Sequence, residues 1–416
     1  MTDLYKAVRT RKNLRAAWRK VYENGISSRS LQTQQEVREY SSQIDTHLAR
    51  ITRQLRDGKF SFKPGKGIAI EKASGGARPI VLPTIESRIV QRAILNILQD
   101  HEPVSKLVNT ATSFGGIKGQ GVRCAIERAC LCFDQGALHY IRSDIKSFFT
   151  KVPKPAIVEI LQTHIDDKPF ISLFEAAISV ELSNFAELEK KGLLEHFPIY
   201  EIGVAQGSCL SPFLANLLLH EFDVATNSTD VTCLRYIDDF LILGPTKKAV
   251  QAKLRVANRC LEKHGLSAYT IDDGSGKAVA GQVKNGFSFL GCDLKPGMVS
   301  PAKGSRNRIL SAVWHELDQS LRVMKNPSMA AKKRRGLADT LKGVSNILRG
   351  WGNQYQFCNN AQVLRDMDGK VSDMLEQFQQ KYIKLLKASL TSDPMNRRRL
   401  MGVHVIADSK KQPIYK

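Results

Sequence analysis

Long apolar runs are missing from this chain of 416 residues. The longest, such as residues 213–219, fall far short of the roughly 20 apolar residues that a membrane-spanning helix needs. The first residues of the chain also lack the apolar core of a signal peptide. Because 42% of the residues are hydrophobic, the chain has enough apolar side chains for two or three domains. We therefore expect a globular protein that works in the cytoplasm.

Closely spaced cysteines are scarce as well. Of the eight cysteines, only Cys130 and Cys132 lie close together in the sequence, and no second pair follows at the spacing of metal ligands. This pattern argues against a zinc site and against a disulfide framework. The cysteines are expected to be thiols of the hydrophobic core.

Acidic residues are too few to balance the basic ones. The chain has 62 Lys and Arg against 40 Asp and Glu, which gives a net charge of +22. The excess lies at the ends, with +7 over residues 1–62 (13 basic, 6 acidic) and +13 over residues 301–416 (22 basic, 9 acidic). Such flanks indicate a nucleic-acid partner, because neutralised phosphates supply most non-specific affinity. The alternative is ordinary solvated helix faces. The candidate phosphate contacts are Lys332, Lys333, Arg334, Arg335, Arg397, Arg398 and Arg399.

The first half of the chain predicts helices, then a hairpin, then a helix. Apolar residues recur at helical spacing through the first sixty residues, up to Gly58. "GKGIAIEKASGGARPIVLPT" is typical of two short strands joined by a turn at residues 74–76. Thr84 is expected to cap a helix that runs to about Leu98. A later apolar strand is expected to end at Asp144.

The second half predicts another hairpin and a helical C-terminal region. Ser211 is expected to be the N-cap and Pro212 the first residue of an apolar helix. Two apolar runs flank Asp238 and Asp239 and predict a hairpin with the acids at its turn. "GFSFLGCDL" and "GMVS" predict a further pair of strands, and after Pro301 the chain is expected to form helices. The expected helix breaks are near Gly336, Gly350 and Pro394.

Two adjacent acids in an apolar hairpin need an explanation, because like charges repel and burial of an unpaired one is costly. Asp144 ends another strand, and in a mixed sheet its carboxylate can converge with Asp238 and Asp239. Three carboxylates together favour hard cations such as Mg²⁺. Two such ions activate an attacking hydroxyl and neutralise a leaving pyrophosphate, which points to nucleotidyl transfer. The alternative is a solvent-exposed acidic turn.

Five motifs then resemble those of reverse transcriptases, in the order found in that family. "YIDD" at residues 236–239 resembles the Tyr-x-Asp-Asp signature, and "SDIKSFF" is similar to the first catalytic strand. "VAQGSCLSPFLANLLLHEFD", "RPIVLPTIESRIVQRAI" and "NILRGWGNQY" resemble the nucleotide loop, the fingers motif and the thumb segment of the bacterial group II intron branch. The resemblance covers roughly residues 63–360. It implies a mixed α/β (α+β) fold, a right hand of fingers, palm and thumb.

The resemblance also implies roles for individual residues. Metal ions, two Mg²⁺ with Mn²⁺ as a possible substitute, would be held at Asp144, Ile145, Asp238 and Asp239, and the three aspartates would be catalytic. Phe149 matches the aromatic steric gate that excludes a ribose 2′-hydroxyl, and its neighbour Phe148 is expected in the core. The remaining substrate-binding residues would be Lys72 and Arg78 on the triphosphate, Gln206 and Gly207 under the incoming nucleotide, and Tyr236 against the primer end. For Arg78 the alternative is a surface charge, and for Tyr236 it is strand packing.

The sequence departs from the family pattern at several points. Ala205 stands where the family has Pro before Gln206, and only Lys277 is available as the general-acid lysine that follows the acidic hairpin. No Cys/His-rich nuclease segment follows the thumb motif, and the motifs expected of retron enzymes, Asn-Ala-x-x-His and Val-Thr-Gly, are missing. The missing nuclease segment argues against a full mobile-intron protein, and the missing motifs argue against a retron enzyme.

The expected organisation is an N-terminal helical extension (1–62), fingers and palm (63–300), and a helical thumb with an RNA-binding region (301–416). The expected function is an RNA-directed DNA polymerase of the unknown-group, defence-associated type. It would use dNTPs to copy a cognate structured noncoding RNA into cDNA in antiphage defence. The alternatives are a group II intron maturase without an endonuclease domain, and an RNA-binding scaffold that has lost catalysis.

Overall fold

A computed structural model describes residues 3–28, 30–71, 77–198, 201–271, 273–389 and 393–409. The chain forms two compact units, Met1–Gln282 and Val283–Lys416. This division by contacts differs from the three functional regions expected from the sequence, which remain a prediction. Within the described residues, no helix is both long and apolar enough to cross a lipid bilayer.

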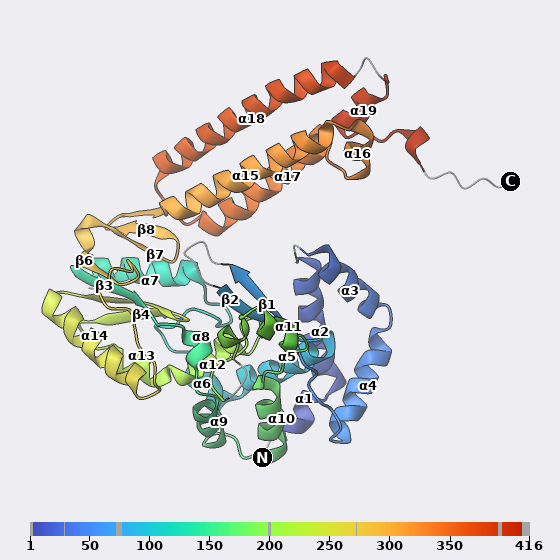
Figure 1. Ribbon diagram of the computed structural model, residues 1–416. Helices are drawn as coiled ribbons and strands as arrows, with labels where there is room; N and C mark the ends of the chain where they lie inside the picture. The colour runs from blue at the N-terminus through green and yellow to red at the C-terminus, as the bar shows by residue number, and fades with distance from the viewer. Residues whose placement is uncertain are drawn as a thin grey trace. The chain divides into compact units, whose positions relative to one another are not determined.

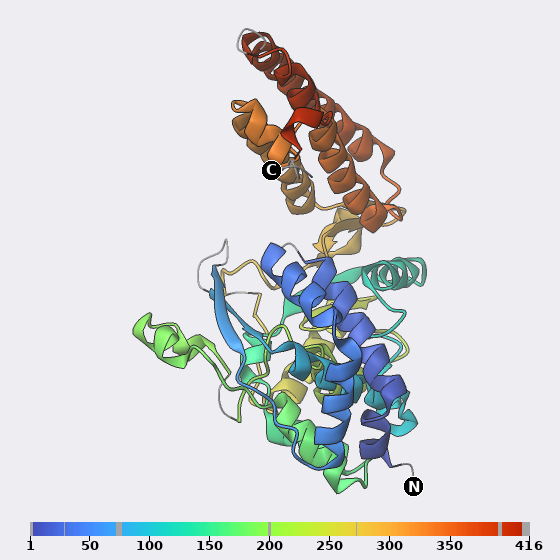
Figure 2. The same ribbon diagram turned by 90° about the vertical axis from the view of Figure 1, so that its right-hand side faces the viewer.

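The N-terminal region is helical, as predicted. It contains α1 (Leu4–Val8), α2 (Arg11–Ile26), α3 (Leu31–Ser41) and α4 (Ile44–Arg56). Thr10 and Ser30 cap α2 and α3 through their hydroxyl groups. The helix α2 packs along α5 (Ile85–Asp100), so the extension shares the hydrophobic core of the first unit (Figure 2).

The predicted fingers hairpin is present. β1 (Lys66–Glu71) and β2 (Ala77–Leu82) pair antiparallel, and the predicted turn at residues 74–76 lies outside the described residues. The side chain of Asn184 fastens β1 from outside the hairpin: its Oδ1 accepts a hydrogen bond from Gly67 N (2.8 Å), and its Nδ2 donates one to Gly67 O (3.0 Å). After β2, the hydroxyl of Thr84 caps α5 as expected.

A four-stranded antiparallel sheet forms the centre of the first unit. Its order is β4-β5-β3-β6, with bounds β3 (His139–Asp144), β4 (Thr232–Tyr236), β5 (Asp239–Gly244) and β6 (Val279–Gln282). The apolar side chains of β3 and β5 are buried, Ile141 and Leu241 among them. Helices α7 (Val122–Asp134), α13 (His220–Thr226) and α14 (Lys247–Glu262) pack against the strands (Figure 1).

The remaining helices of the first unit surround this sheet and the hairpin. They are α6 (Glu102–Val108), α7 (Val122–Asp134), α8 (Phe148–Lys151), α9 (Lys154–Gln162), α10 (Lys168–Ile178), α11 (Phe185–Lys190), α12 (Ser211–Leu218), α13 (His220–Thr226) and α14 (Lys247–Glu262). One predicted cap is wrong by a residue: α12 begins at Ser211, and Leu210 holds the N-cap position. The reason is that the Ser211 hydroxyl donates to Ala205 O (2.6 Å) instead of capping the helix.

The second unit joins a small sheet to a helical bundle. Its elements are β7 (Phe287–Phe289), β8 (Cys292–Lys295), β9 (Met298–Pro301), α15 (Lys303–Met324), α16 (Pro327–Lys332), α17 (Leu337–Tyr355), α18 (Ala361–Ser389) and α19 (Asn396–Met401). The helix α15 packs against both α17 and α18 (Figure 1). The predicted break at Gly350 is wrong, because α17 continues through it. In the same helix, Trp351 donates to the Ser305 hydroxyl (3.2 Å), which fastens α17 to α15.

The cysteines fit the prediction of core thiols. None of the eight, all within the described residues, forms a disulfide, and five of them are buried. The buried set comprises Cys132, Cys233, Cys260, Cys292 and Cys358.

Candidate active site

Three aspartates meet at one end of the central sheet. β4 and β5 are joined by the two-residue turn Ile237-Asp238, and β5 begins at Asp239. Asp239 is paired in register with Asp144, the last residue of β3. The backbone N–H of Ile145 donates to the carbonyl of Asp238 (3.1 Å), which ties the turn to the end of β3. The convergence expected from the sequence is therefore present in the fold.

The electrostatics of this cluster are unfavourable for three ionised acids. Burial, then the nearby Asp144 and Asp239 carboxylates, raise the pKa of Asp238 to about 7. Burial and Asp144 raise the pKa of Asp239 to about 6. Without a cation, part of the cluster must therefore hold protons near neutral pH.

Only one of the two oxygens of the Asp144 carboxylate accepts a hydrogen bond. Its Oδ2 accepts from Lys277 Nζ at 3.1 Å, whereas its Oδ1 is buried without a hydrogen-bond partner. A buried acceptor left unpaired is costly, and a bound cation would satisfy it. Among the described residues, no group of three or more His, Cys, Asp or Glu side chains is already arranged to hold a metal ion. The fit to Mg²⁺ therefore rests on the oxygen donors and on the orphaned Oδ1, not on a preformed cage. Ile145 has a buried side chain and offers only backbone atoms.

Lys277, the candidate general-acid lysine from the sequence, contacts the cluster. Its ammonium lies 4.4 Å from the centre of the Tyr269 ring as well as beside Asp144. Burial lowers the pKa of Lys277, but hydrogen bonds with Asp144 and Tyr269 outweigh this effect and leave the pKa above its ordinary value. Lys277 is therefore protonated in this arrangement.

An open cavity of about 790 Å³ lies over the acids. It brings together seven of the sequence-predicted site residues: Arg78, Asp144, Ile145, Phe149, Gln206, Gly207 and Asp238. Lys277 and Tyr269 also line it, as do Ile70 and Glu71 of the fingers hairpin. Two predicted residues, Tyr236 and Asp239, are half-buried beside the cavity rather than in its lining. Lys72 lies outside the described residues.

The two phenylalanines after β3 differ in burial, as expected. Phe148 is 2% exposed and belongs to the hydrophobic core. Phe149 is partly exposed, and its carbonyl accepts from Val204 N (2.7 Å). This hydrogen bond joins α8 to the segment that precedes the Gln206 loop.

The Gln206 loop is held against the fingers hairpin at close range. The Gln206 carbonyl accepts from Val81 N (3.0 Å). Gly207 has φ 111°, and a Cβ there would lie 3.1 Å from Val81 O. Both the backbone conformation and the close approach therefore require glycine. The loop keeps this position although Ala205 replaces the family proline, because the Ser211 hydroxyl holds the Ala205 carbonyl.

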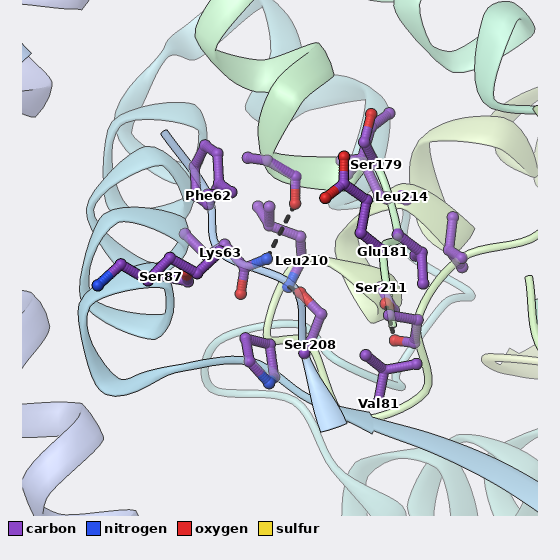
Figure 3. Close-up of a pocket in the computed structure, with 18 residues that line it drawn as sticks. Phe62, Lys63, Val81, Ser87, Ser179, Glu181, Ser208, Leu210, Ser211 and Leu214 are labelled. Carbon is purple, nitrogen blue, oxygen red and sulfur yellow. Dashed lines mark hydrogen bonds between the residues drawn. The ribbon is translucent and has the colours of Figure 1, made fainter. Parts of the chain in front are cut away.

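A much smaller cavity, of about 40 Å³, lies behind the same loop (Figure 3). Ser208 and Ser211 line both cavities, so the loop separates them. On the far side, Gln91 donates to Ala177 O (2.9 Å), while its Oε1 is buried without a partner. Gln91 lies in α5 and Ala177 in α10, so this hydrogen bond joins the two helices behind the Gln206 loop.

The predicted phosphate contacts lie in the second unit. Some of them form ion pairs within the protein, whereas others are exposed. Arg335 forms an ion pair with Glu316 (2.5 Å), and Arg399 pairs with both Asp393 (2.5 Å) and Asp408 (2.7 Å). Arg398 donates to the His404 carbonyl. The side chains of Lys332, Lys333 and Arg334 are at least partly exposed, as is that of Arg397.

The sequence did not identify Arg235 as a site residue, although it lies directly before the acidic signature. Its side chain is fully buried beneath the acid hairpin. The signal available was a single arginine within the apolar strand "TCLRY", since a charge is rarely buried without dedicated partners.

Comparison with known proteins matches residues 70–271 to the family described as "Reverse transcriptase (RNA-dependent DNA polymerase)". An uncharacterized 91 kDa protein in the cob intron of Schizosaccharomyces pombe is 34% identical over 176 residues, or 42% of this chain and 20% of that protein. Protein YkfC of Escherichia coli is 27% identical over 278 residues, or 57% of this chain and 68% of that protein. The group II intron-encoded protein LtrA of Lactococcus lactis subsp. cremoris is 28% identical over 180 residues, or 42% of this chain and 27% of that protein. The chain thus spans only a minor part of the length of the first and third of these relatives.

Proposed function

We propose that the chain is an RNA-directed DNA polymerase that extends a primer with dNTPs on an RNA template, because its residues 70–271 match the reverse transcriptase family. The observation that carries the proposal is the pairing of Asp144 with Asp239 across β3 and β5, with Asp238 at the adjoining turn. The cavity over these acids is large enough for a nucleotide.

The three aspartates would hold two Mg²⁺ ions, with Asp144 and Asp238 as the main ligands, Asp239 as a weaker one and Ile145 contributing through its backbone. Bound Mg²⁺ would supply activation of the primer 3′-hydroxyl and neutralisation of the leaving pyrophosphate. Lys277 holds a proton at Nζ beside Asp144, so it is available to protonate the leaving group. Arg78 at the cavity wall would contact the triphosphate through its guanidinium fork.

Residues around the nucleotide would select its sugar and position its base. Phe149, partly exposed in the cavity, would exclude a ribose 2′-hydroxyl and favour dNTPs. Gln206 and Gly207 would support the incoming nucleotide, because glycine lets the backbone approach closely. Tyr236, beside Asp239, would contact the primer end. Lys72 would complete the triphosphate contacts.

The template that we propose is a cognate structured noncoding RNA, copied into cDNA in the cytoplasm as part of antiphage defence. The support is the +13 charge of residues 301–416, together with an N-terminal helical extension that shares the core of the palm. Structured RNA is commonly recognised through its shape and backbone, which suits a basic helical surface.

A group II intron maturase without an endonuclease domain is the second candidate. Two of the relatives are named for introns, the cob intron protein and LtrA, and this favours an intron RNA as the partner. Sequencing of RNA that co-purifies with the protein separates the two candidates. Intron RNA would support the maturase, whereas one short noncoding RNA would support the defence role.

Primer extension tests the activity itself. The purified chain is given a primed RNA template, Mg²⁺ and labelled dNTPs, with the same primer on a DNA template and rNTPs as comparisons. We expect template-dependent extension on RNA with dNTPs and little use of rNTPs. Lack of RNA-templated synthesis, from a folded protein that still binds RNA, would instead support an RNA-binding scaffold that has lost catalysis.

A further inference from the structure

A buried ion pair lies directly beneath the acid hairpin. Arg235 in β4 is 0% exposed, and the side chain of its partner Asp223 in α13 is 1% exposed. The pair is bidentate, with Nε donating to Oδ1 at 2.6 Å and Nη2 donating to Oδ2 at 2.5 Å. Charges buried this deeply persist only when geometry and further hydrogen bonds compensate their lost hydration.

The Arg235 guanidinium has no unused donor. A guanidinium has five N–H groups, and the structure gives five hydrogen bonds: two to Asp223, then Nη2 to Ser113 Oγ (2.9 Å), Nη1 to Asn216 Oδ1 (2.9 Å) and Nη1 to the Ile237 carbonyl (3.0 Å). The first four of these bonds fix the plane of the group. The fifth, to the carbonyl of Ile237, reaches the turn that carries Asp238.

Ile237 is held in an unfavourable backbone conformation. Its φ is 62°, in the left-handed region that β-branched residues avoid. Arg235 holds its carbonyl, and the next carbonyl, that of Asp238, accepts from Ile145 N. The turn between Tyr236 and Asp239 is therefore held from two sides.

The segment that supplies Ser113 also packs on this turn. Arg235 N donates to Thr112 O (2.8 Å), and Phe114 N donates to Arg235 O (2.9 Å). A Cβ at Gly115 would lie 2.5 Å from Ile237 Cγ1, so glycine is required for the contact. The surroundings of Arg235 thus enclose Ile237 as well as the ion pair.

We propose that Arg235 is a positioning residue that sets the location of the Asp238 carboxylate by holding the carbonyl of Ile237. The inference rests on the proposed function, in which Asp238 is a metal ligand. Arg235 acts through the turn and not on the substrate. A purely structural ion pair with Asp223 would not require the fifth donor to reach the turn that carries Asp238.

The test compares wild type with Arg235→Lys. Lysine keeps a positive charge opposite Asp223 but replaces five planar donors with three donors on one atom. We expect kcat for dNTP incorporation to fall about 100-fold, because small displacements of a catalytic group have effects of that size. The KM for dNTP should stay within about twofold, since the interaction matters in the transition state. The Mg²⁺ concentration that gives half-maximal rate should rise, and RNA binding should be unchanged.

Two further variants separate positioning from stability. Glycine adopts left-handed φ readily, so Ile237→Gly combined with Arg235→Lys should recover part of the lost kcat. Leu261→Ala removes a fully buried aliphatic side chain from α14 in the same core. It should lower the melting temperature while kcat per folded molecule stays unchanged.

The outcomes decide between the proposals. If wild type polymerises and Arg235→Lys keeps its kcat and its Mg²⁺ requirement, the positioning role is wrong. If wild type does not polymerise, the proposed function is wrong, and amide hydrogen exchange of residues 236–239 then judges the positioning role alone. Faster exchange in Arg235→Lys than in Leu261→Ala would support it, and equal exchange would overturn it.

Discussion

At the scale of single residues, Asp238 and Asp239 bear most of the electrostatic cost of bringing the acids of the site together. Their pKa values are raised to about 7 and about 6 by burial and by neighbouring carboxylates. Without a nearby cation, the ionised form of each carboxylate is disfavoured, as expected of carboxylates that bind metal ions. Asp144 shares the arrangement, because one of its oxygens is buried and unpaired.

These pKa values predict how the stability of the metal-free protein depends on pH. In the unfolded chain the two acids ionise near their ordinary pKa of about 3.9. In the folded protein they keep their protons up to pH 6 or 7, so the folded state binds more protons in between. Their stabilising contribution is therefore present below about pH 4 and is lost as pH rises through 6 to 7.

Mg²⁺ should reverse this loss, because it binds the ionised acids. We expect Mg²⁺ to raise the melting temperature at about pH 8 and to have little effect at about pH 5. Calorimetry with and without Mg²⁺ measures both values. The Asp238→Asn, Asp239→Asn double variant is the control and should show no Mg²⁺ shift. An equal Mg²⁺ effect at both pH values would contradict the assignment of these acids as ligands.

Sugar selection is a second property of a single residue. Replacing Phe149 with Ala removes ring volume from the cavity wall, so rNTP incorporation should rise relative to dNTP incorporation. Phe174→Leu is the matched control, because Phe174 is buried in the same core, lies outside the cavity lining and should affect stability only. The ratio of kcat/KM for dNTP and rNTP is the measurement. An unchanged ratio in Phe149→Ala would mean that Phe149 is not the gate.

At the scale of elements, the Gln206 loop depends on its contact with β2. Gly207→Ala places a Cβ 3.1 Å from Val81 O at a backbone φ of 111°. We expect the free energy of unfolding to fall by about 1–3 kcal/mol and the KM for dNTP to rise, because the loop must move.

Gly119→Ala is the control for backbone strain alone. Gly119 has φ 79°, and nothing lies within 4 Å of the position that an alanine Cβ would take there. The variant should lose stability without a change in the KM for dNTP. Equal KM values in Gly207→Ala and wild type would show that the loop does not support the nucleotide.

Elements with strong local signals could be predicted from the sequence. The fingers hairpin followed from its turn residues, and α5 followed from the cap at Thr84. The predicted right-hand polymerase fold is confirmed at the level of the family. Where packing outweighs local preference, prediction failed: a single glycine costs a helix only about 1 kcal/mol, so α17 continues through Gly350. The short edge strand β6, with the sequence "VAGQ", was not predicted because four residues carry little pattern.

The candidate site could be predicted in part. The acids and Gln206 were named because their motifs are short and contiguous. The support for Asp238 could not be predicted, because Arg235 contacts Ser113 and Asn216, which lie 122 and 19 residues away in the sequence. Such long-range hydrogen bonds leave no local pattern.

At the scale of the whole molecule, the charge distribution predicts salt-dependent RNA binding. Each phosphate contact should contribute about 0.7–0.9 to the slope of log K against log salt. Changing Lys332, Lys333 and Arg334 together to Gln should flatten this slope for the co-purified RNA, because these side chains are at least partly exposed.

Arg399→Gln is the matched control for that experiment. Its charge is already balanced by Asp393 and Asp408, so its loss should lower stability and leave the salt slope almost unchanged. A slope that stays the same in the triple variant would point to other cations, with the +7 of residues 1–62 as the next candidates.

The most direct test of RNA-templated nucleotidyl transfer is single-nucleotide dNTP incorporation by the Asp238→Ala, Asp239→Ala double variant. We predict incorporation at background level, with folding and RNA binding retained, because the metal ligands are lost while the hairpin remains. Asp230→Asn is the control, since Asp230 is an exposed acid that precedes β4 and lies outside the cavity lining, and it should polymerise like wild type. Substantial synthesis by the double variant would contradict the assignment of polymerase activity to this site.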